Sequence, residues 1–557
     1  MKKLLCLILA CTFFFIGCNK SNDIKEGTAT TEKENESKTE VTEENSTSEE
    51  TDKRLVYAIW NTPNGIFNPL ISNIQQDGYV NSIVYNSLLE QNNKGELENS
   101  LAKSFEINED ATEVKITLRD DVYWSDGEKF SADDVVFTFE SLANKDYTGE
   151  YYNRVENIVG ASEVKDGTKE NIEGITVDND TITIKFTQSF APSKTLLGTT
   201  PILPKHIWSK TEVKNWENET ELLNKPVGTG AFIVKDFKSG VGVYFERNEK
   251  YFKGVPKLKY IDMLVFNADT APAELINKNI DIAEISNFNQ DDIAQLKNAG
   301  IQITSYPTSN IQYMGMNNQN EILKIKEVRQ AFAYAIDRQA IVDNLLEGHG
   351  LVINTPMVPT LWSYPDNLIN YSKDLDKAKE LLASAGLKDN DNDGFVEYNG
   401  KKVSFTLVVP LGNKTRELTG PIIKSELEQI GIEIILDQKE FPAVMEQVVE
   451  KREYDMYLMA NTLDLDPDPK PNWYSTASWN FVGYINPKTD ELIDAGLKAA
   501  TQDERKAIYN EFGKILNEDL PWLPLYAPDV MCAFQENITN YEPNTFAEFY
   551  NIENWDK

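Results

Sequence analysis

Residues 124–139 read WSDGEKFSADDVVFTF, and this stretch carries the clearest structural signal in the chain. Its Ser125-Asp126-Gly127 segment has turn chemistry, because an aspartate bonds to nearby backbone and glycine accepts a positive φ. Ser131 and Asp134 then form the start of a capped helix, which continues with the apolar residues Val135 and Phe139. The stretch therefore predicts a tight turn followed at once by an amphipathic helix.

Further strands and helices are predicted on both sides of this stretch. Order begins with an apolar strand at residues 55–59, and alternating apolar residues predict half-buried strands at 114–118, 182–186 and 405–409. Helical spacing is found at residues 328–336, at 376–385 before Gly386, and after the capping segment 501–504. This irregular mixture, without a repeat of fixed period, favours an α/β or α+β fold with long-range strand pairing, and we expect the α/β class.

The N-terminus has the pattern of an export signal. Met1-Lys2-Lys3 precedes an apolar run from Leu4 to Ile16 that is too short to span a bilayer, and Gly17-Cys18 follows. The segment resembles a bacterial lipoprotein signal, so we expect removal of residues 1–17 and lipidation of Cys18. A rival lipobox ends at Cys11, and an ordinary signal or membrane anchor with an incidental cysteine is the alternative.

Composition extends this interpretation. Residues 18–53 are rich in Ser, Thr and Glu without an aromatic residue, which predicts a disordered tether. The formal charge is −34, which argues against nucleic acid or an anionic membrane surface as a partner. Besides the N-terminal Cys6, Cys11 and Cys18, the chain has only Cys532, so we expect no disulfide within the folded part.

Several catalytic patterns are missing from the sequence. It contains no GxxxxGK[ST] phosphate loop, no HExxH zinc helix and no GxSxG nucleophile segment. His206 and His349 are its only histidines, which argues strongly against a histidine-based triad or a multi-histidine metal site. A carboxylate pair of the glycosidase kind stays open, since acidic residues are abundant. We expect a chain that is not an enzyme.

Eight segments, in order along the chain, together resemble the solute-binding proteins of oligopeptide and dipeptide ABC importers. They are FNPL at 67–70, VYNSLL at 84–89, WSDG at 124–127 with ADDV at 132–135, PVGTG at 226–230, RN at 247–248 with YF at 251–252, VRQAFAYAIDR at 328–338, DPDP at 466–469 and LPLY at 523–526. The chain departs from the family at Ala460-Asn461, where many relatives carry Gly-Trp. Three of these motifs are interpreted as architecture and not as ligand contacts: the turn at 125–127, the GTG segment at 228–230 and the helix at 328–338.

The resemblance implies a two-lobed periplasmic-binding-protein-like fold (type II) with an extra subdomain. Lobe I would comprise residues 54–75, 205–315 and 525–557, the extra subdomain 76–204, and lobe II 316–524. A peptide would be enclosed between the lobes by a hinge motion. The membrane-tethered, monomeric protein would then deliver it to an ABC permease with its ATPase subunits.

The stretch from Asp464 to Tyr484 is the predicted ligand-binding loop, because its prolines exclude regular structure and rigidly held loops commonly carry binding groups. By resemblance, an acidic residue of this loop captures the α-ammonium group of a peptide, with Asp464 as first choice and Asp466 as second. The alternative is that Asp466 and Asp468 are turn residues and the tryptophans belong to the core. The full set of candidate ligand-binding residues is Asp464, Asp466, Asp468, Trp473, Trp479, Asn480, Tyr484 and Asn317.

Residues 389–397, DNDNDGFVE, form a candidate calcium loop. Asp389, Asp391 and Asp393 occupy positions one, three and five, as in loops that wrap oxygen atoms around a hard cation. Position twelve would be Gly400, so this is not a standard EF-hand, and Glu397 is the substitute ligand. The alternative is an Asp/Asn-rich connector, and any bound calcium would be structural. No other cofactor is expected.

The ligand itself stays open at this point. An oligosaccharide, an opine-like compound or a metal chelate could occupy the same fold, although the shortage of histidine disfavours direct nickel ligation. A peptide-sensing receptor and a surface hydrolase are the further alternatives.

Overall fold

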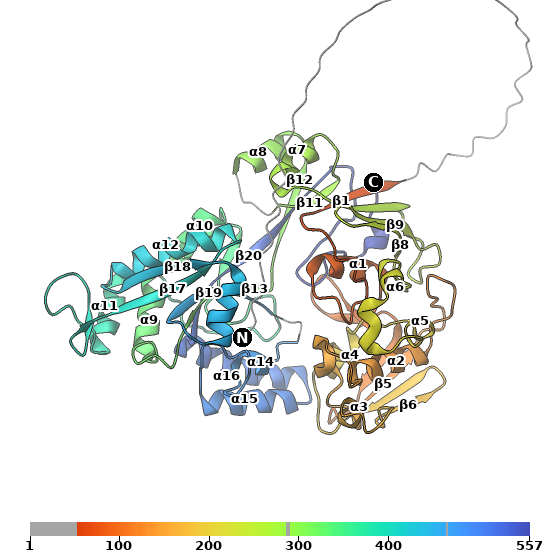
Figure 1. Ribbon diagram of the computed structural model, residues 1–557, viewed down its shortest axis with the longest axis horizontal. Coiled ribbons are helices and arrows are strands. Elements are labelled where there is room, and N and C mark those ends of the chain that lie inside the picture. Colours follow the sequence, from red (N-terminus) through yellow and green to blue (C-terminus); the bar gives the residue numbers. More distant parts are fainter. Residues whose placement is uncertain (1–52, 286–289, 464–465) are drawn as a thin grey trace, which may run out of the picture. The chain divides into compact units, whose positions relative to one another are not determined.

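The computed structural model describes residues 53–285, 290–463 and 466–557 (Figure 1). The predicted signal, Cys18 and nearly all of the tether lie outside these ranges, as does Asp464. Cys532 is buried with a free thiol. Within the described ranges, no helix combines the length and the apolar character needed to cross a bilayer.

The strands and helices predicted from local patterns are present. The strands are β1 (Arg54–Ile59), β5 (Glu113–Leu118), β7 (Thr181–Lys185) and β17 (Ser404–Pro410). The helices are α2 (Ala132–Ala143), α9 (Lys326–Ala335), α11 (Leu375–Ser384) and α16 (Gln502–Asp519). Both predicted capping boxes form, at Ser131 and at Thr501, and Gly386 after α11 has φ +85°. These predictions succeeded because each depends on interactions within a few residues.

One large mixed sheet organises the folded chain. Its strand order is β18-β17-β19-β13-β20-β11-β1-β10-β9-β8, with β12 and β14 also paired to β20. Besides β1 and β17 it contains β8 (Phe232–Lys238), β9 (Gly242–Arg247), β10 (Tyr260–Val265), β11 (Ile282–Glu284), β12 (Gln302–Pro307), β13 (Asn310–Met316), β14 (Gly350–Val352), β18 (Glu433–Lys439), β19 (Met456–Thr462) and β20 (Trp522–Phe534).

Strand β20 is shared by the two halves of this sheet. Its first part pairs with β13, from Trp522 to Tyr526, and its last part pairs with β11 and β12, up to Phe534. The buried apolar residues fall into separate clusters on the two sides: two clusters use chain segments before residue 308 and after 529, and two use segments between 311 and 527. The result is the expected two-lobed α/β fold; the predicted residue boundaries of the lobes stay a prediction.

A four-stranded antiparallel sheet, in the order β4-β5-β7-β6, forms a separate layer with α2. It is grouped in Figure 1 with the helices that follow it in the chain. Its further strands are β4 (Ala102–Ile107) and β6 (Ile175–Asp178). Two small hairpins complete the strands: β2 (Leu89–Gln91) with β3 (Leu97–Asn99), and β15 (Glu397–Tyr398) with β16 (Lys401–Lys402).

The remaining helices and helical turns connect these strands. The helices are α1 (Gln75–Val84), α3 (Ala161–Lys165), α4 (Ser193–Gly198), α5 (Lys205–Trp208), α6 (Thr220–Asn224), α7 (Ala271–Ile276), α8 (Gln290–Asn298), α10 (Arg338–Leu345), α12 (Lys414–Glu428), α13 (Phe441–Met445), α14 (Lys470–Trp473) and α15 (Pro487–Lys498). The turns are η1 (Glu150–Arg154), η2 (Val213–Asn218), η3 (Ala268–Thr270), the π-helical η4 (Glu446–Glu450) and η5 (Ile552–Asn554).

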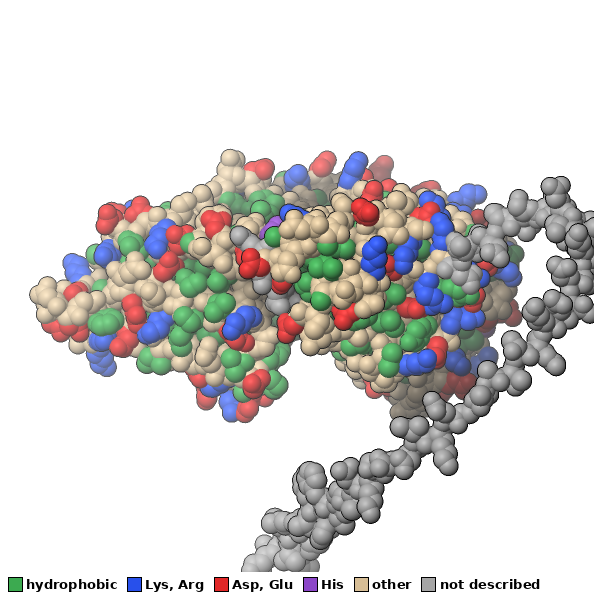
Figure 2. Space-filling view, turned by 90° about the horizontal axis from the view of Figure 1, so that it is seen from above, with side chains coloured by type: hydrophobic (Ala, Val, Ile, Leu, Met, Phe, Trp, Pro, Cys, Tyr) green, Lys and Arg blue, Asp and Glu red, His purple; other side chains and the backbone are tan. Residues whose placement is uncertain are grey.

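Acidic and basic side chains are interspersed on the face shown in Figure 2. They lie among apolar and neutral side chains instead of gathering into one patch, so this face carries no extended surface of one sign.

The WSDG and GTG motifs meet at Gly228. The Ser125 amide donates to the Gly228 carbonyl oxygen at 2.9 Å, and the Gly228 amide donates to Ser125 Oγ at 3.3 Å. A Cβ atom at Gly228 would lie 2.0 Å from the carbonyl oxygen of Val84, at the end of α1. Glycine is required here by close backbone approach, which supports the architectural interpretation of both motifs.

Asp134 is the central acceptor of the α2 N-terminus. Its carboxylate accepts hydrogen bonds from the Ser131 amide at 2.9 Å, the Lys205 amide at 2.9 Å and Trp124 Nε1 at 3.3 Å. Burial raises the pKa of Asp134, and the two amide hydrogen bonds lower it. One side chain thus joins the turn, α2 and α5.

Replacing Asp134 with alanine is expected to lower the free energy of unfolding by about 2–4 kcal/mol, because buried donors lose their acceptor. Its neighbour Asp133 is exposed and pairs only with Lys205 at the surface, so Asp133→Ala should cost less than about 1 kcal/mol. Urea unfolding of both variants measures the difference. Equal losses would contradict the role assigned to Asp134.

Candidate functional site

A cavity of about 450 Å³ lies between the predicted binding loop and the segment containing η1. One wall is formed by Glu150, Tyr151, Arg154 and Thr199, with their neighbours. The other wall is formed by residues of the segments 356–361 and 461–473, together with Trp479 and Phe512. Residues more than 250 positions apart in the sequence therefore face one space. Four predicted residues line it: Asp466, Asp468, Trp473 and Trp479.

The loop has more regular structure than the prolines suggested. Residues 470–473 form the one-turn helix α14, and Pro471 lies within its first turn, where the missing amide hydrogen is tolerated. The prediction that prolines exclude helix from the whole loop was therefore wrong at this turn. Asp464, the first choice for ammonium capture, lies outside the described residues.

Asp466 is engaged in a buried ion pair with Arg505 of α16. Its Oδ1 lies 2.6 Å from Nη2 and its Oδ2 lies 2.8 Å from Nη1, and the two side chains are 3% and 5% exposed. This bidentate geometry uses both carboxylate oxygens. In this structure Asp466 holds the loop on α16, and its carboxylate is not free for a ligand ammonium group.

Asp468 is the more available carboxylate. It is partly exposed, lines the cavity, and accepts a hydrogen bond from the Lys470 amide at 2.9 Å. Burial raises its pKa to about 6, with the Asp466 carboxylate adding to the shift. The bond to Lys470 is the predicted turn role, and the remaining lone pairs can accept hydrogen bonds from a ligand.

The two tryptophans of the loop differ in exposure. Trp473 is buried and stacks on Trp522, with ring centroids 5.2 Å apart. Trp479 is 57% exposed and stacks on Phe481 at the rim of the cavity. Trp473 thus serves both core and cavity wall, whereas Trp479 offers an open aromatic face.

Three predicted ligand-binding residues do not line this cavity and make structural hydrogen bonds instead. Asn480 donates to the Tyr484 carbonyl oxygen at 2.7 Å and accepts from the Tyr484 amide at 3.1 Å. The Tyr484 hydroxyl donates to Asp519 at 2.6 Å, and Asn317 Nδ2 donates to the Tyr454 carbonyl oxygen at 3.0 Å. Their polar atoms thus already have protein partners, and their role as ligand contacts stays a prediction.

The structure adds one charged residue that the sequence did not indicate. Arg416, at the start of α12, forms no salt bridge among the described residues and donates through Nε and Nη2 to Gln312 Oε1 at 3.1 and 3.0 Å. Gln312 bonds to Asn310, and Asn310 to Thr462, which lines the cavity. A partly buried guanidinium without a carboxylate partner among the described residues is unexpected in a chain with so many acidic residues. The sequence could not indicate it, because the partners of Arg416 are set by the fold.

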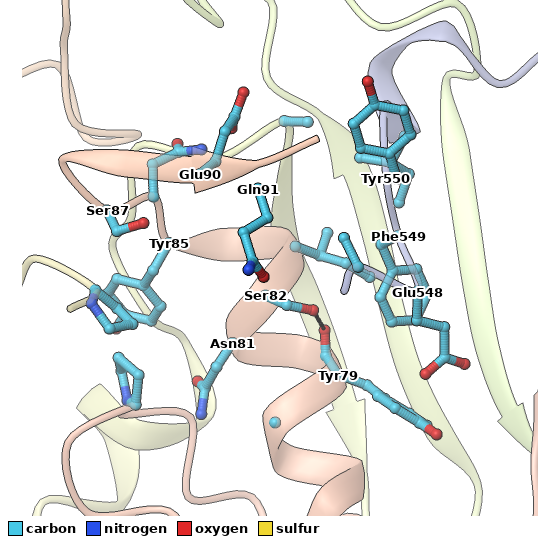
Figure 3. Close-up of a pocket in the computed structure, with 18 of the residues that line it drawn as sticks. Tyr79, Asn81, Ser82, Tyr85, Ser87, Glu90, Gln91, Glu548, Phe549 and Tyr550 are labelled. Carbon is cyan, nitrogen blue, oxygen red and sulfur yellow. Dashed lines mark hydrogen bonds between the residues drawn. The ribbon is translucent and has the colours of Figure 1, made fainter. Parts of the chain in front are cut away.

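A second cavity, of about 580 Å³, adjoins the first (Figure 3). Tyr151 and Thr199 line both. Residues of helix α1 line this cavity, and the helix lies in the middle of the view in Figure 3. Tyr85 and Ser87 lie on one side of the helix, and Phe549 and Tyr550 lie on the other. The two cavities are therefore neighbours in the folded chain.

Comparison with known proteins identifies the family. The model of the bacterial extracellular solute-binding proteins, family 5 (middle part), matches residues 96–482. The chain belongs to this family. Its members are binding proteins and not enzymes, which confirms the prediction that this solute-binding protein is not catalytic.

Relatives of this solute-binding protein cover most of its length. The oligopeptide-binding protein AppA of Bacillus subtilis is 30% identical over 500 residues, 88% of this chain and 89% of the relative. The structure of that protein with a nonapeptide has a TM-score of 0.73 at 29% identity, covering 90% and 98% of the two chains. NikZ of Campylobacter jejuni, in complex with Ni(L-His), has a TM-score of 0.75 at 27% identity, covering 91% and 100%.

The candidate calcium ligands of this solute-binding protein converge. One ligand atom from each of Asp389, Asp391, Asp393 and Glu397 lies within 4.8 Å of the others. Some of their oxygen atoms also accept loop hydrogen bonds, such as Asp389 from the Asn392 amide at 2.7 Å and Glu397 from the Asn390 amide at 2.9 Å. The loop is thus folded with its carboxylates together, and calcium binding stays a prediction.

Calcium is expected to raise the unfolding temperature of this solute-binding protein, because a cation that binds only the folded loop stabilises it by about 2.7 kcal/mol at 100 times its Kd. An Asp391→Asn, Asp393→Asn double variant should lose the effect, while Asp376→Asn, which changes a carboxylate outside the loop, should keep it. A differential scanning measurement with and without calcium decides. A shift that survives in the double variant would contradict this site.

Breaking the Asp466–Arg505 pair is expected to destabilise the solute-binding protein strongly. Asp466→Asn should lower the free energy of unfolding by about 3–5 kcal/mol, because a buried guanidinium loses its counter-charge. Asp468→Asn is the matched control and should have little effect. Recovery of stability in an Asp466→Leu, Arg505→Met double variant would confirm the cause, whereas equal stability of the two single variants would refute it.

Proposed function

We propose that the protein is a lipid-anchored extracellular solute-binding protein that captures oligopeptides in the two adjoining cavities and delivers them to an ABC importer. The observation that carries this proposal is that the two cavities adjoin, since Tyr151 and Thr199 are wall residues of both. An extended peptide needs about 3.3 Å of length per residue, so a chain of several residues could occupy both cavities.

The chemistry of the walls supports a peptide ligand. Asp468 offers a carboxylate, Trp479 an open aromatic face and Thr462 a hydroxyl linked through Asn310 and Gln312 to the Arg416 guanidinium. The Asp468 carboxylate, the Arg154 guanidinium and aromatic faces on the walls of one cavity match the ammonium group, the carboxylate and the varied side chains of peptides. The similarity to a B. subtilis relative with a bound nonapeptide points the same way.

The lipid anchor and the capture of the peptide amine rest on the sequence. Cleavage before Cys18 and lipidation of its thiol would hold the protein at the membrane, where it meets the permease. Asp464 is the proposed acceptor of the α-ammonium group, and Asp468 is the available carboxylate on the described part of the loop.

A metal chelate is the second candidate, because the C. jejuni neighbour at 27% identity was solved with Ni(L-His). Direct nickel ligation by this chain is disfavoured on its own geometry. His206 lies 2.7 Å from Asp126, away from both cavities, and neither cavity is lined by a histidine. A chelate would therefore have to bring its own ligands.

Native mass spectrometry of a soluble form starting near residue 54, purified from a peptide-rich medium, is expected to show a ladder of small peptides. Asp464→Asn should weaken binding of a free-amine peptide on the order of 10-fold or more, because a charged hydrogen bond is lost, and should leave an N-acetylated peptide unaffected. Asp376→Asn, outside the cavities, is the control. An empty protein, or one carrying a single sugar or chelate, would overturn the peptide assignment.

A further inference from the structure

Glu548 lines the second cavity close to Tyr79 and Phe549 (Figure 3). We propose that this carboxylate is a specificity-determining residue that accepts a cationic group of the ligand, so that peptides with a basic side chain are preferred. The inference rests on the proposed function and adds the substrate class. Its ligand chemistry is an ammonium or guanidinium group.

The fold places Glu548 against one face of the large sheet. The Tyr57 hydroxyl of β1 donates a hydrogen bond to Glu548 Oε1. Tyr57 of β1 is paired with Ile282 of β11, and Glu284, two residues further along β11, is paired with Cys532 of β20. Because residues two apart in a strand point to the same face, Tyr57, Glu284 and Cys532 share that face. In Figure 3 the Tyr79 hydroxyl and the Glu548 carboxylate point into the same region.

The groups that act on the Glu548 carboxylate include no cation; Lys253 lines the same cavity and pairs with Glu90. Among the described residues, neither Glu548 nor Glu284 forms a salt bridge, and the other titratable groups that act on Glu548 or on its immediate neighbours are the neutral Tyr57, Tyr79, Tyr306, Tyr541 and Cys532. Burial raises the pKa of Glu548 to about 7, the nearby Glu284 carboxylate adds to the rise, and the Tyr57 hydrogen bond lowers it. A buried carboxylate without a counter-charge is unfavourable, and a cation from the ligand would remove that cost.

A second acid in the same cavity provides the contrast. Glu90 lines the cavity and pairs with Lys253, so its charge is already compensated by the protein. Both acids are partly buried and lie on the wall of one space, but Glu90 has a salt-bridge partner and Glu548 has none among the described residues. Glu553, a third acid on this wall, also forms no salt bridge among the described residues, so the Glu548→Gln variant has to assign the preference. Because Tyr151 and Thr199 line both cavities, a peptide anchored in the first one can extend a side chain toward Glu548.

The test is calorimetric titration with peptides of one length that differ only in a lysine or its uncharged isostere norleucine. The wild-type protein should bind the lysine peptide more tightly, on the order of 10-fold or more, because a charged hydrogen bond replaces an unpaired buried carboxylate. Glu548→Gln, which keeps an acceptor for Tyr57, should remove this preference. Glu90→Gln, which makes the same change in net charge, should keep it.

The pH dependence gives a readout that does not require a variant. Glu548 must be ionised to hold a cation, and burial raises its pKa to about 7. The preference for the lysine peptide over the norleucine peptide should therefore be small at pH 6 and larger at pH 8, and it should reverse with the pH change. N-acetylated versions of both peptides identify the source: a preference that survives acetylation belongs to the side chain, and one that is lost belongs to the α-ammonium group.

Two outcomes would overturn the proposal, and they are distinguishable. Equal binding of lysine and norleucine peptides by the wild-type protein, or an unchanged preference in Glu548→Gln, overturns the role of Glu548 while peptide binding stands. If no peptide binds the wild-type protein at any pH, the proposed function fails and this inference fails with it.

Discussion

The continuous pairing of strand β20 holds the folded chain together. One strand of 13 residues bonds to β13 in one half of the sheet and to β11 and β12 in the other. Apolar cores form separately on the two sides, so each half is stabilised by its own burial while the backbone passes between them. In a fold of this kind, a hinge motion can move one half relative to the other through backbone changes at a few positions, and both cores stay packed.

The walls of the cavities depend on buried polar contacts at loop ends. Asp134 fixes the start of α2 against Trp124 and Lys205, and the Asp466–Arg505 pair fixes the binding loop on α16. Each contact satisfies groups that would otherwise be buried without partners, so each loop has one favourable position. The open groups of the site, such as Asp468 and Trp479, are displayed on supports that these contacts make rigid.

The charges that the protein leaves uncompensated are informative about the solute. A number of exposed acidic and basic groups form salt bridges at the surface. Among the described residues, Glu548 and Arg416 form none, although both are partly buried. Desolvated charges cost free energy, and under the proposed function a ligand that supplies the counter-charge would recover it.

The sequence by itself determined both capping boxes and the alternating strands, because these depend on neighbours within a few residues. The mixture of elements indicated the α/β class, and eight segments spread along the chain indicated the family. The sequence also indicated Asp466, Asp468, Trp473 and Trp479, which line the cavity. Asn480, Tyr484 and Asn317 do not line it and bond to other protein groups, which they meet only in the folded chain. Tyr57 and Glu548 are 491 positions apart, and Asp466 and Arg505 are 39 apart. Only the tertiary structure decided which charges are paired, because the partner of a buried charge is set by strand order and packing and not by spacing along the chain.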